Sequence, residues 1–456
     1  MVAISLEVNL GFYGSIWYCV AEMGNSCSCM RQSGGASAST PSNTASTPNT
    51  IGECSNSMSV EQQIERSKTY WSTLVDGQVD QSSSGFGGLA EDDCVAKESN
   101  VLEFLELQRH PTWGGFFQTF GYEFENSGYK RLGELVVGEK FAEGGQAELF
   151  HAKLTWWNPK DNERVKKNGT EYVVKVFKKG TFLRDLKSQL PHGLLQDHVE
   201  AMEDLKSPTP KLIPRNFCYI HRGILLENGQ FAFLMEKEDF NLRSLIDRKM
   251  GLRSDGDCGP FSKEDGEIMI YYIALGVEWL HNRNIIHKDL KASNVLVKEF
   301  TSTWPKWVCY VADYECSNAV IGMGFCRAPE ILQTLKERMI SEKPEVFSRA
   351  SDIYAYGMTC YEVLTGKLPF EDHPLRNKTS LLTHQVINHD LRPEIPKYVE
   401  DWAHNLLNSC WQSDSRARPS VGEILDLLST NSASVKRRVK YQKEKFGENF
   451  KYVSKH

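Results

Sequence analysis

IIHKDLKASNVLV, residues 285–297, is the stretch of sequence that decides the fold. It sets three polar side chains, Asp289, Lys291 and Asn294, between two runs of apolar residues. Short runs rich in Ile and Val are typical of buried β-strands, so we expect the polar residues in a loop held between buried segments. The spacing H-x-D-L-K-x-x-N is too specific for chance to be a good explanation.

Two more segments carry side chains of related chemistry. Lys175 lies in the predicted strand EYVVKVF, residues 171–177, and Asp313 follows the predicted strand in YVADY, residues 310–314. A lone lysine on a strand is usually an exposed charge. Together with the first segment, however, the chain offers a cation for phosphates, oxygen ligands for magnesium and a carboxylate that positions a hydroxyl group. Phosphoryl transfer from a nucleotide requires these parts.

The chain resembles the protein kinase family over about 300 residues. Ala328-Pro329-Glu330 matches the motif that closes the activation segment, and residues 348–370 resemble the central helix of the helical lobe. The string CWQSDSRARPS, residues 410–420, resembles the closing motif of the tyrosine-kinase-like branch of serine/threonine kinases. The resemblance implies an α+β, bilobal fold with a small β-rich N-lobe and a larger helical C-lobe. The order of strand and helix patterns along the chain agrees with it.

The resemblance also assigns chemical roles, with ATP and Mg²⁺ as cofactors and a protein as substrate. Lys175 would hold the α- and β-phosphates, and Asp289 would orient the substrate hydroxyl group and accept its proton. Lys291 would neutralise the γ-phosphate. Asn294 and Asp313 would bind the magnesium ions. Lysine two residues after the aspartate resembles the serine/threonine version of this loop, because tyrosine kinases usually have alanine there.

Other residues match supporting positions of the family. The string LME ends in Met235 and Glu236, and it resembles the gatekeeper and the hinge whose backbone would bind adenine. Asp352 would support the catalytic loop. Arg418 would pair with Glu330.

The glycine-rich loop departs from the family pattern. Residues 141–150 read FAEGGQAELF, so Gly144 is kept while Ala142 and Ala147 replace the other two glycines. Glycine at such positions lets backbone amides approach the phosphates closely. We therefore expect weaker nucleotide binding, with Gly145 as the fourth loop residue near the nucleotide.

The helix that should supply an acidic partner for Lys175 also departs from the pattern. An apolar stripe at helical spacing predicts this helix. The stripe consists of Leu195, Val199, Met202 and Leu205. By this register the inward position falls on His198, a poor substitute for a carboxylate. A shift of one turn is the alternative, and it would bring Glu200 or Glu203 to Lys175.

The activation segment shows further departures. Glu315 replaces the glycine of the Asp-Phe-Gly motif, and Met323 replaces the threonine expected before the closing motif. Lys288 replaces the arginine that reads activation-loop phosphate, and lysine lacks the planar bidentate fork. These changes predict a loop that phosphorylation does not switch. Two hypotheses therefore stay open: an active serine/threonine kinase and a pseudokinase that acts as a scaffold.

Composition limits the other function classes. The chain has 456 residues, of which 40% are hydrophobic and 25% are charged. Its net charge of −6 gives no overall positive potential that would favour binding of nucleic acid. The longest apolar run, residues 268–280, is too short to span a membrane and contains Glu278. The predicted organisation is an N-terminal extension with a disordered linker (1–59), a partly ordered region (60–130), the kinase domain (131–430) and a basic tail (431–456).

Two segments suggest a membrane surface as a further partner. Met23 begins the string MGNSCSCM, so a start there would expose Gly24 for myristoylation, with Cys27 and Cys29 placed for palmitoylation. An internal low-complexity run is the alternative. The scattered cysteines predict a cytoplasmic protein, and the motif predicts its attachment to the plasma membrane. The basic residues of 436–456 either form a solvated tail or assist this attachment.

Overall fold

The computed structural model describes the parts of the chain that carry the predicted catalytic residues. The described residues are 89–110, 114, 116–119, 122–126, 129–144, 146–157, 171–184, 216–226, 229–252, 258–314 and 324–446. From Asp93 onward they belong to one compact unit, and the fold of that unit follows.

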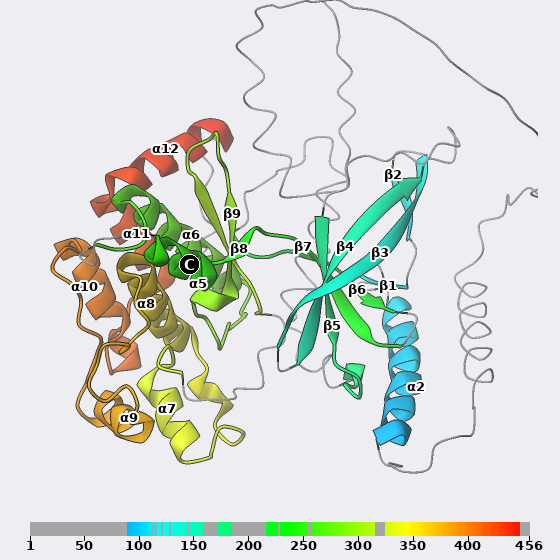
Figure 1. Ribbon diagram of the computed structural model, residues 1–456, viewed down its shortest axis with the longest axis horizontal. Helices are drawn as coiled ribbons and strands as arrows, with labels where there is room; N and C mark the ends of the chain where they lie inside the picture. The colour runs from blue at the N-terminus through cyan, green and yellow to red at the C-terminus, as the bar shows by residue number, and fades with distance from the viewer. Residues whose placement is uncertain are drawn as a thin grey trace, which may run out of the picture. The chain divides into compact units, whose positions relative to one another are not determined.

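Seven strands form the sheet of the N-lobe (Figure 1). They are β1 (Phe117–Thr119), β2 (Tyr122–Asn126), β3 (Tyr129–Glu143), β4 (Ala147–Trp157), β5 (Glu171–Phe177), β6 (Ile220–Leu225) and β7 (Phe231–Glu236). The spatial order is β1-β6-β7-β5-β4-β3-β2. Only the pair of β1 with β6 is parallel among the pairs of this sheet.

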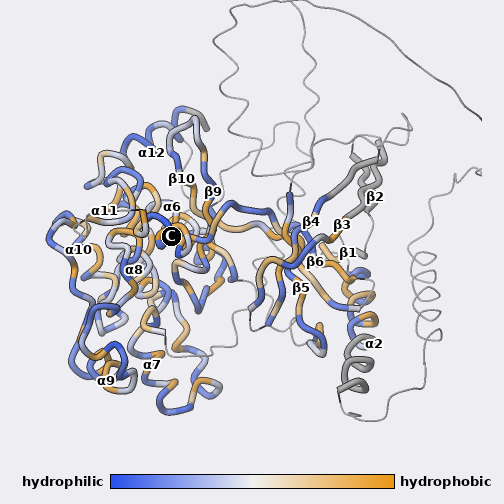
Figure 2. The backbone as a smooth tube through the Cα atoms, viewed as in Figure 1, coloured by the Kyte–Doolittle hydropathy of each residue, from blue (hydrophilic) through white to orange (hydrophobic). Residues whose placement is uncertain are grey.

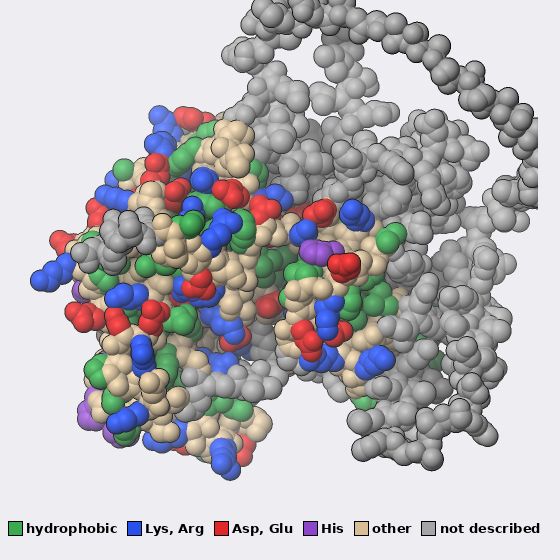
Figure 3. Space-filling view, viewed as in Figure 1, with side chains coloured by type: hydrophobic (Ala, Val, Ile, Leu, Met, Phe, Trp, Pro, Cys, Tyr) green, Lys and Arg blue, Asp and Glu red, His purple; other side chains and the backbone are tan. Residues whose placement is uncertain are grey.

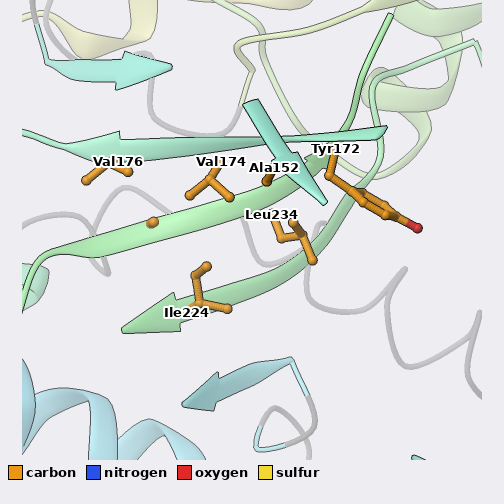
Figure 4. Packing of buried hydrophobic residues seen from close by; sticks show 7 residues of the cluster. Ala152, Tyr172, Val174, Val176, Ile224 and Leu234 are labelled. Carbon is orange, nitrogen blue, oxygen red and sulfur yellow. The ribbon is translucent and has the colours of Figure 1, made fainter. Parts of the chain in front are cut away.

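The alternation of side chains along β5 separates a packed face from a functional face. Tyr172, Val174 and Val176 are buried and contact a cluster of apolar residues from the neighbouring strands (Figure 4). Successive side chains of a strand point to opposite faces, so Lys175 lies on the other side of the sheet. The hydrophobic core thus fixes the direction in which Lys175 points.

The sheet begins before the predicted domain boundary. That boundary, residue 131, falls inside β3, and β2 pairs with β3 with Tyr122 opposite Gly133. The helix predicted at 100–108 is longer, because α2 spans Leu89–Gln108. Strands β1 and β2 and the first residues of β3 therefore belong to the kinase sheet.

The C-lobe is helical, with a small sheet of three strands. The helices are α5 (Leu242–Gly251), α6 (Lys263–Asn282), α7 (Pro329–Lys336), α8 (Arg349–Thr365), α9 (Thr379–Asn388), α10 (Asp401–Cys410), α11 (Val421–Asn431) and α12 (Ala433–Phe446), with short 3-10 helices η1 (Ala292–Asn294), η2 (Pro344–Val346) and η3 (Ser415–Ala417). The strands are β8 (Phe240–Asn241), β9 (Val295–Glu299) and β10 (Trp307–Val311), in the order β10-β9-β8.

Two helices form the centre of this lobe. Nearly every residue of α6 from Gly266 to His281 is buried, as expected of a core helix, and Figure 2 shows hydrophobic residues along it. α8 starts with a capping box between Ser348 and Ser351 and ends at Gly366, whose φ of 78° suits glycine. Among the described residues, no helix has the length and apolarity needed to cross a membrane.

The predicted basic tail is a packed helix as far as Phe446. Val435 of α12 is fully buried, and the Tyr271 hydroxyl group donates to Gln442 at 3.1 Å. The Ser432 hydroxyl group donates to Glu267 at 2.6 Å. Residues 433–446 thus form a helix packed on the C-lobe, a feature that neither alternative for the basic residues, a solvated tail or help in membrane attachment, included.

Figure 3 shows Lys and Arg side chains interspersed with Asp and Glu on the visible face.

Several predicted residues lie outside the described part of the chain, and they remain predictions. They are Gly24, Cys27, Cys29, Gly145, His198, Glu200, Glu203, Glu315, Met323 and the end of the basic tail from residue 447.

Candidate active site

Asp352 of α8 holds the backbone of the loop that contains Asp289. Its carboxylate accepts the His287 N–H at 2.8 Å and the Lys288 N–H at 3.0 Å. His281 Nε2 lies 3.0 Å from the same carboxylate. Because Lys288 has a φ of 69°, in the left-handed region that non-glycine residues rarely adopt, these two bonds stabilise a strained conformation.

Both oxygens of the Asp289 carboxylate are held by donors. Lys291 Nζ lies 2.7 Å from Oδ2, and Asn294 Nδ2 donates to Oδ2 at 3.2 Å and to the Asp289 carbonyl oxygen at 2.8 Å. Arg327 Nη2 lies 3.3 Å from Oδ1. The structure thus gathers two of the predicted residues, Lys291 and Asn294, around the carboxylate of Asp289, which is 31% exposed to solvent.

Asp313 connects this loop to the N-lobe. The N–H of Ala312 donates to the Asn294 carbonyl oxygen at 2.9 Å, and Asp313 itself has a φ of 61°. Lys175 Nζ lies 3.1 Å from Asp313 Oδ1. The structure therefore brings Lys175 and Asp313 together, beside the loop that holds Asp289.

The pKa of Asp313 reports the same convergence. The charge of Lys175 is the largest cause that holds this pKa below its usual value, and burial opposes it. The charges of His287 and Lys291 lower it further, so the Asp313 carboxylate lies in the field of the catalytic loop. An ionised carboxylate is the form that binds a cation.

The donor set fits a magnesium ion bound with a nucleotide. The Asn294 amide nitrogen is engaged by Asp289, so its oxygen is the atom offered to a metal, together with the Asp313 carboxylate. Within the described ranges, no group of three or more His, Cys, Asp or Glu residues could hold a metal ion. Magnesium in nucleotide sites usually takes one or two protein ligands and completes its shell with phosphate and water oxygens, so the two residues suffice.

The glycine loop forms a tight turn between β3 and β4. The Gly144 N–H donates to the Ala147 carbonyl oxygen at 2.8 Å, while Ala142 lies opposite Leu149. A Cβ added at Gly144 would meet only the Ala147 carbonyl oxygen, at an ordinary 3.7 Å. The structure around Gly144 therefore tolerates a side chain, and the need for glycine at this position concerns the phosphates.

Ion pairs hold this turn. Glu143 pairs with Lys178 at 2.8 Å and with Lys140 at 3.0 Å, and these lysines lower its pKa to about 2, the Lys178 hydrogen bond most of all. Lys140 also pairs with Glu148 at 2.9 Å. A hairpin that lacks two glycines is thus tied to the residue that follows β5.

The predicted hinge residues end β7. Met235 lies opposite Val173, and Glu236 lies opposite Tyr172, so β5 and β7 are in register up to the hinge. Two residues further on, burial raises the pKa of Glu238 to about 8, although the charge of Lys298 opposes the shift. A neutral acid beside the hinge avoids the cost of burying a charge that Lys298, 3.7 Å away, compensates only in part.

Arg418 and Glu330 form a bidentate ion pair. Nη1 donates to Oε1 at 2.7 Å and Nη2 donates to Oε2 at 2.8 Å. The Arg418 side chain is fully buried, and it also donates to the carbonyl oxygens of Ala350 and Gln412. The pair therefore ties the start of α7 to the segment before α11.

Sequence reasoning missed two residues with long-range contacts. Arg327 stands directly before Ala328-Pro329-Glu330, and its place next to a recognised motif was the available signal. Asn100 makes hydrogen bonds to the residues after β5, and no motif marks it.

Comparison with known proteins agrees with this geometry. A family model of protein tyrosine and serine/threonine kinases matches residues 137–428. The "Light-sensor Protein kinase" of Ceratodon purpureus is 31% identical over 50% of this chain and 18% of that protein. The serine/threonine-protein kinase STY17 of Arabidopsis thaliana is 31% identical over 34% of this chain and 26% of its own length.

A third relative is the mitogen-activated protein kinase kinase kinase 5 of Homo sapiens. It is 26% identical over 50% of this chain and 16% of its own length. The chain thus spans about a quarter or less of these relatives. The family model, in contrast, covers more than half of the chain, and Lys175, Asp289 and Asp313 lie within the matched residues. The chain belongs to the protein tyrosine and serine/threonine kinase family, on its tyrosine-kinase-like serine/threonine branch.

Proposed function

We propose that the protein is a kinase that uses Mg²⁺ and ATP to phosphorylate serine or threonine residues of a protein substrate. One observation carries the proposal: Lys175 of the N-lobe and Asp313 of the C-lobe form an ion pair at 3.1 Å, next to the loop of Asp289. Residues far apart in the sequence thus meet as phosphoryl transfer requires.

Each side chain has a role that its contacts support. Asp289 orients the attacking hydroxyl group and accepts its proton, and Asn294 holds its carboxylate and carbonyl oxygens in place. Lys291, at 2.7 Å from that carboxylate, supplies positive charge for the transferred phosphoryl group. Magnesium, when bound by Asn294 and Asp313, neutralises charge on the phosphates.

Two features support hydroxyl groups of serine and threonine as acceptors. Lys291 occupies the position at which tyrosine kinases usually have alanine. The relatives from Arabidopsis thaliana include proteins that are named serine/threonine-protein kinases. A screen of peptides for phosphorylation can identify the class of substrate protein.

A pseudokinase scaffold is the second candidate, because the same ion pair that brings the residues together opposes nucleotide binding. The ammonium group and the carboxylate neutralise one another directly, so a nucleotide must compete with Asp313 for Lys175. Ala142 and Ala147 in the glycine loop act in the same direction. A protein with this site could keep the fold and bind no nucleotide.

Nucleotide binding and phosphate transfer, measured side by side, separate the two candidates. The test combines a thermal shift with Mg·ATP and transfer of labelled phosphate to casein, for the wild type and Asp289→Asn. We expect the substitution to lower transfer by about 100-fold to 10,000-fold and to leave the thermal shift in place. The matched control is Asp372→Asn, which alters an aspartate paired with Lys367 at the surface.

The outcomes point to different functions. Transfer that survives Asp289→Asn contradicts the kinase proposal. A wild type that shows neither a thermal shift nor transfer supports the scaffold.

Membrane attachment through Gly24 is a separate proposal that rests on the string MGNSCSCM. Mass spectrometry of the cellular N-terminal peptide tests it. Myristate on Gly24 supports the proposal, and a peptide that starts at Met1 or Val2 contradicts it.

A further inference from the structure

The segment before the matched kinase residues is built into the N-lobe through aromatic side chains. Phe104 of α2 is fully buried, with its ring 6.0 Å from that of Phe117 in β1 and 6.2 Å from that of Phe231 in β7. The Phe231 ring stacks on Phe177 at 5.7 Å. Phe177 lies two residues after Lys175, so Phe231 of β7 links α2 to the end of the strand that carries the phosphate-binding lysine.

Asn100 of α2 binds the backbone of the loop that follows this strand. Its Oδ1 accepts the Leu183 N–H at 2.6 Å, and its Nδ2 donates to the Thr181 carbonyl oxygen at 2.9 Å. Asn100 is 4% exposed and Leu183 is fully buried. A carboxamide is suited to this contact, because it offers one acceptor and one donor side by side.

The same loop also holds the glycine hairpin. The Lys178 N–H donates to the Gln146 carbonyl oxygen at 3.0 Å, and Lys178 Nζ pairs with Glu143 at 2.8 Å. Within the loop, the Thr181 N–H donates to the Lys178 carbonyl oxygen at 3.1 Å. Residues 178–184 therefore connect Asn100 at one end to the glycine hairpin at the other.

We propose that Asn100 is a positioning residue for nucleotide binding, so that α2 acts as a built-in support of the phosphate-binding side of the N-lobe. By fixing Thr181 and Leu183, Asn100 sets where the chain leaves the Lys175 strand and where Lys178 meets the glycine hairpin. This inference rests on the proposed function, since it names a determinant of ATP affinity in the same site.

The physical reason is that the two bonds satisfy backbone groups, of which the Leu183 N–H is buried and the Thr181 carbonyl oxygen is partly buried. Without the carboxamide, the Leu183 N–H and the Thr181 carbonyl oxygen lose these partners, and a buried group without a partner costs free energy. The loop then adopts other conformations, and Lys175 and Lys178 are less often in the arrangement that a triphosphate needs. The effect falls on nucleotide affinity rather than on the substrate protein.

Two substitutions and a control on the same helix test the proposal in the full chain. Asn100→Ala removes both bonds, and Asn100→Asp keeps the acceptor for Leu183 but sets a carboxylate oxygen against the Thr181 carbonyl oxygen. Leu102→Ala is the control, because Leu102 is 62% exposed. The measurements are KM for ATP, KM for casein, Kd for a fluorescent ATP analogue, and hydrogen exchange of residues 178–184.

We expect Asn100→Ala to raise KM for ATP and Kd for the analogue by about threefold to tenfold. KM for casein should stay within about twofold, since no bond to the substrate side changes. Exchange of residues 178–184 should become faster. Asn100→Asp should act in the same direction, and Leu102→Ala should match the wild type.

The outcomes keep this inference apart from the proposed function. Faster exchange with unchanged nucleotide affinity overturns it, because Asn100 then has only a structural role. A wild type that binds nucleotide without transferring phosphate contradicts the kinase proposal. The Kd values of the wild type and the Asn100 variants for the ATP analogue then decide this inference by themselves. A wild type that binds no nucleotide overturns the inference. If Asn100→Ala fails to fold, Asn100→Asp decides by the same measurements.

Discussion

Arg327 holds the oxygen of the Asp289 carboxylate that Lys291 leaves open. Its Nη2 lies 3.3 Å from Oδ1, while Lys291 and Asn294 contact Oδ2. The guanidinium is largely buried, so solvent screens the contact only in part. A cation from the end of the activation segment therefore takes part in orienting the catalytic carboxylate.

Replacement of Arg327 should lower the rate of transfer. In Arg327→Met the Asp289 carboxylate loses one of its three donors and samples more rotamers, so we expect kcat to fall about fivefold while KM for ATP is unchanged. Steady-state kinetics with casein measure both constants. The control is Arg416→Met, whose side chain is 88% exposed. An unchanged kcat in Arg327→Met would show that the contact has no role in orientation.

Arg418 and Arg416 should differ sharply in their effect on stability, although they stand two residues apart. Arg418→Met leaves Glu330 without its buried bidentate partner, and the free energy of unfolding should fall by about 3–5 kcal/mol. Arg416→Met breaks an exposed pair with Asp414, which solvent screens, and should leave the free energy of unfolding almost unchanged. Urea denaturation of the two variants gives both values. Similar losses would contradict the assignment of the Arg418 pair as structural.

Glu278 should make stability depend on pH. Burial, with a smaller effect of Asp426, raises its pKa to about 7, from the 4.5 that is usual for a glutamate. Between these values the folded state holds more protons than the unfolded state, so this group lowers stability as pH rises through the window. Glu278→Gln should therefore be on the order of 2–3 kcal/mol more stable than the wild type at pH 8, with little difference at pH 4.5.

Urea denaturation at several pH values measures this effect. The control is Glu345→Gln in η2, since Glu345 is exposed. A stability difference for Glu278→Gln that stays constant with pH would argue against a titrating buried carboxyl group.

Removal of α12 should destabilise the C-lobe. A chain that ends after Asn431 loses the buried Val435 and the hydrogen bonds to Glu267 and Tyr271, so the free energy of unfolding should fall by about 3 kcal/mol or more. A chain that ends after Phe446 is the matched control and should keep the stability of the full chain. Thermal denaturation compares them. Equal melting temperatures would mean that α12 packs without stabilising the lobe.

The local part of the site could be predicted from the sequence. Asp289, Lys291 and Asn294 lie within one short loop, so their spacing already limits where their side chains can meet. Arg418 and Glu330 are distant in the chain but belong to motifs of the family, and the resemblance paired them. The bilobal fold and the family itself are confirmed by the family match.

The remaining features depend on packing that no spacing rule encodes. Asn100 binds residues 81 and 83 positions away, and a single buried amide leaves no periodic pattern in the sequence. The composition of α12 is so basic that the sequence gives no sign of its buried residues, among them Val435 and Gln442. The acylation site and His198, with the helix predicted around it, stay predictions.

The short strand β1 has a consequence for the handling of this protein. Phe117–Thr119 covers the outer edge of β6, where the Gly223 N–H donates to the Phe116 carbonyl oxygen at 3.0 Å. A recombinant fragment cut to the family match alone would leave that edge open, with the Phe231 ring beside it. Open edges recruit strands from other molecules, so such a fragment should precipitate or form oligomers where the longer chain stays dispersed.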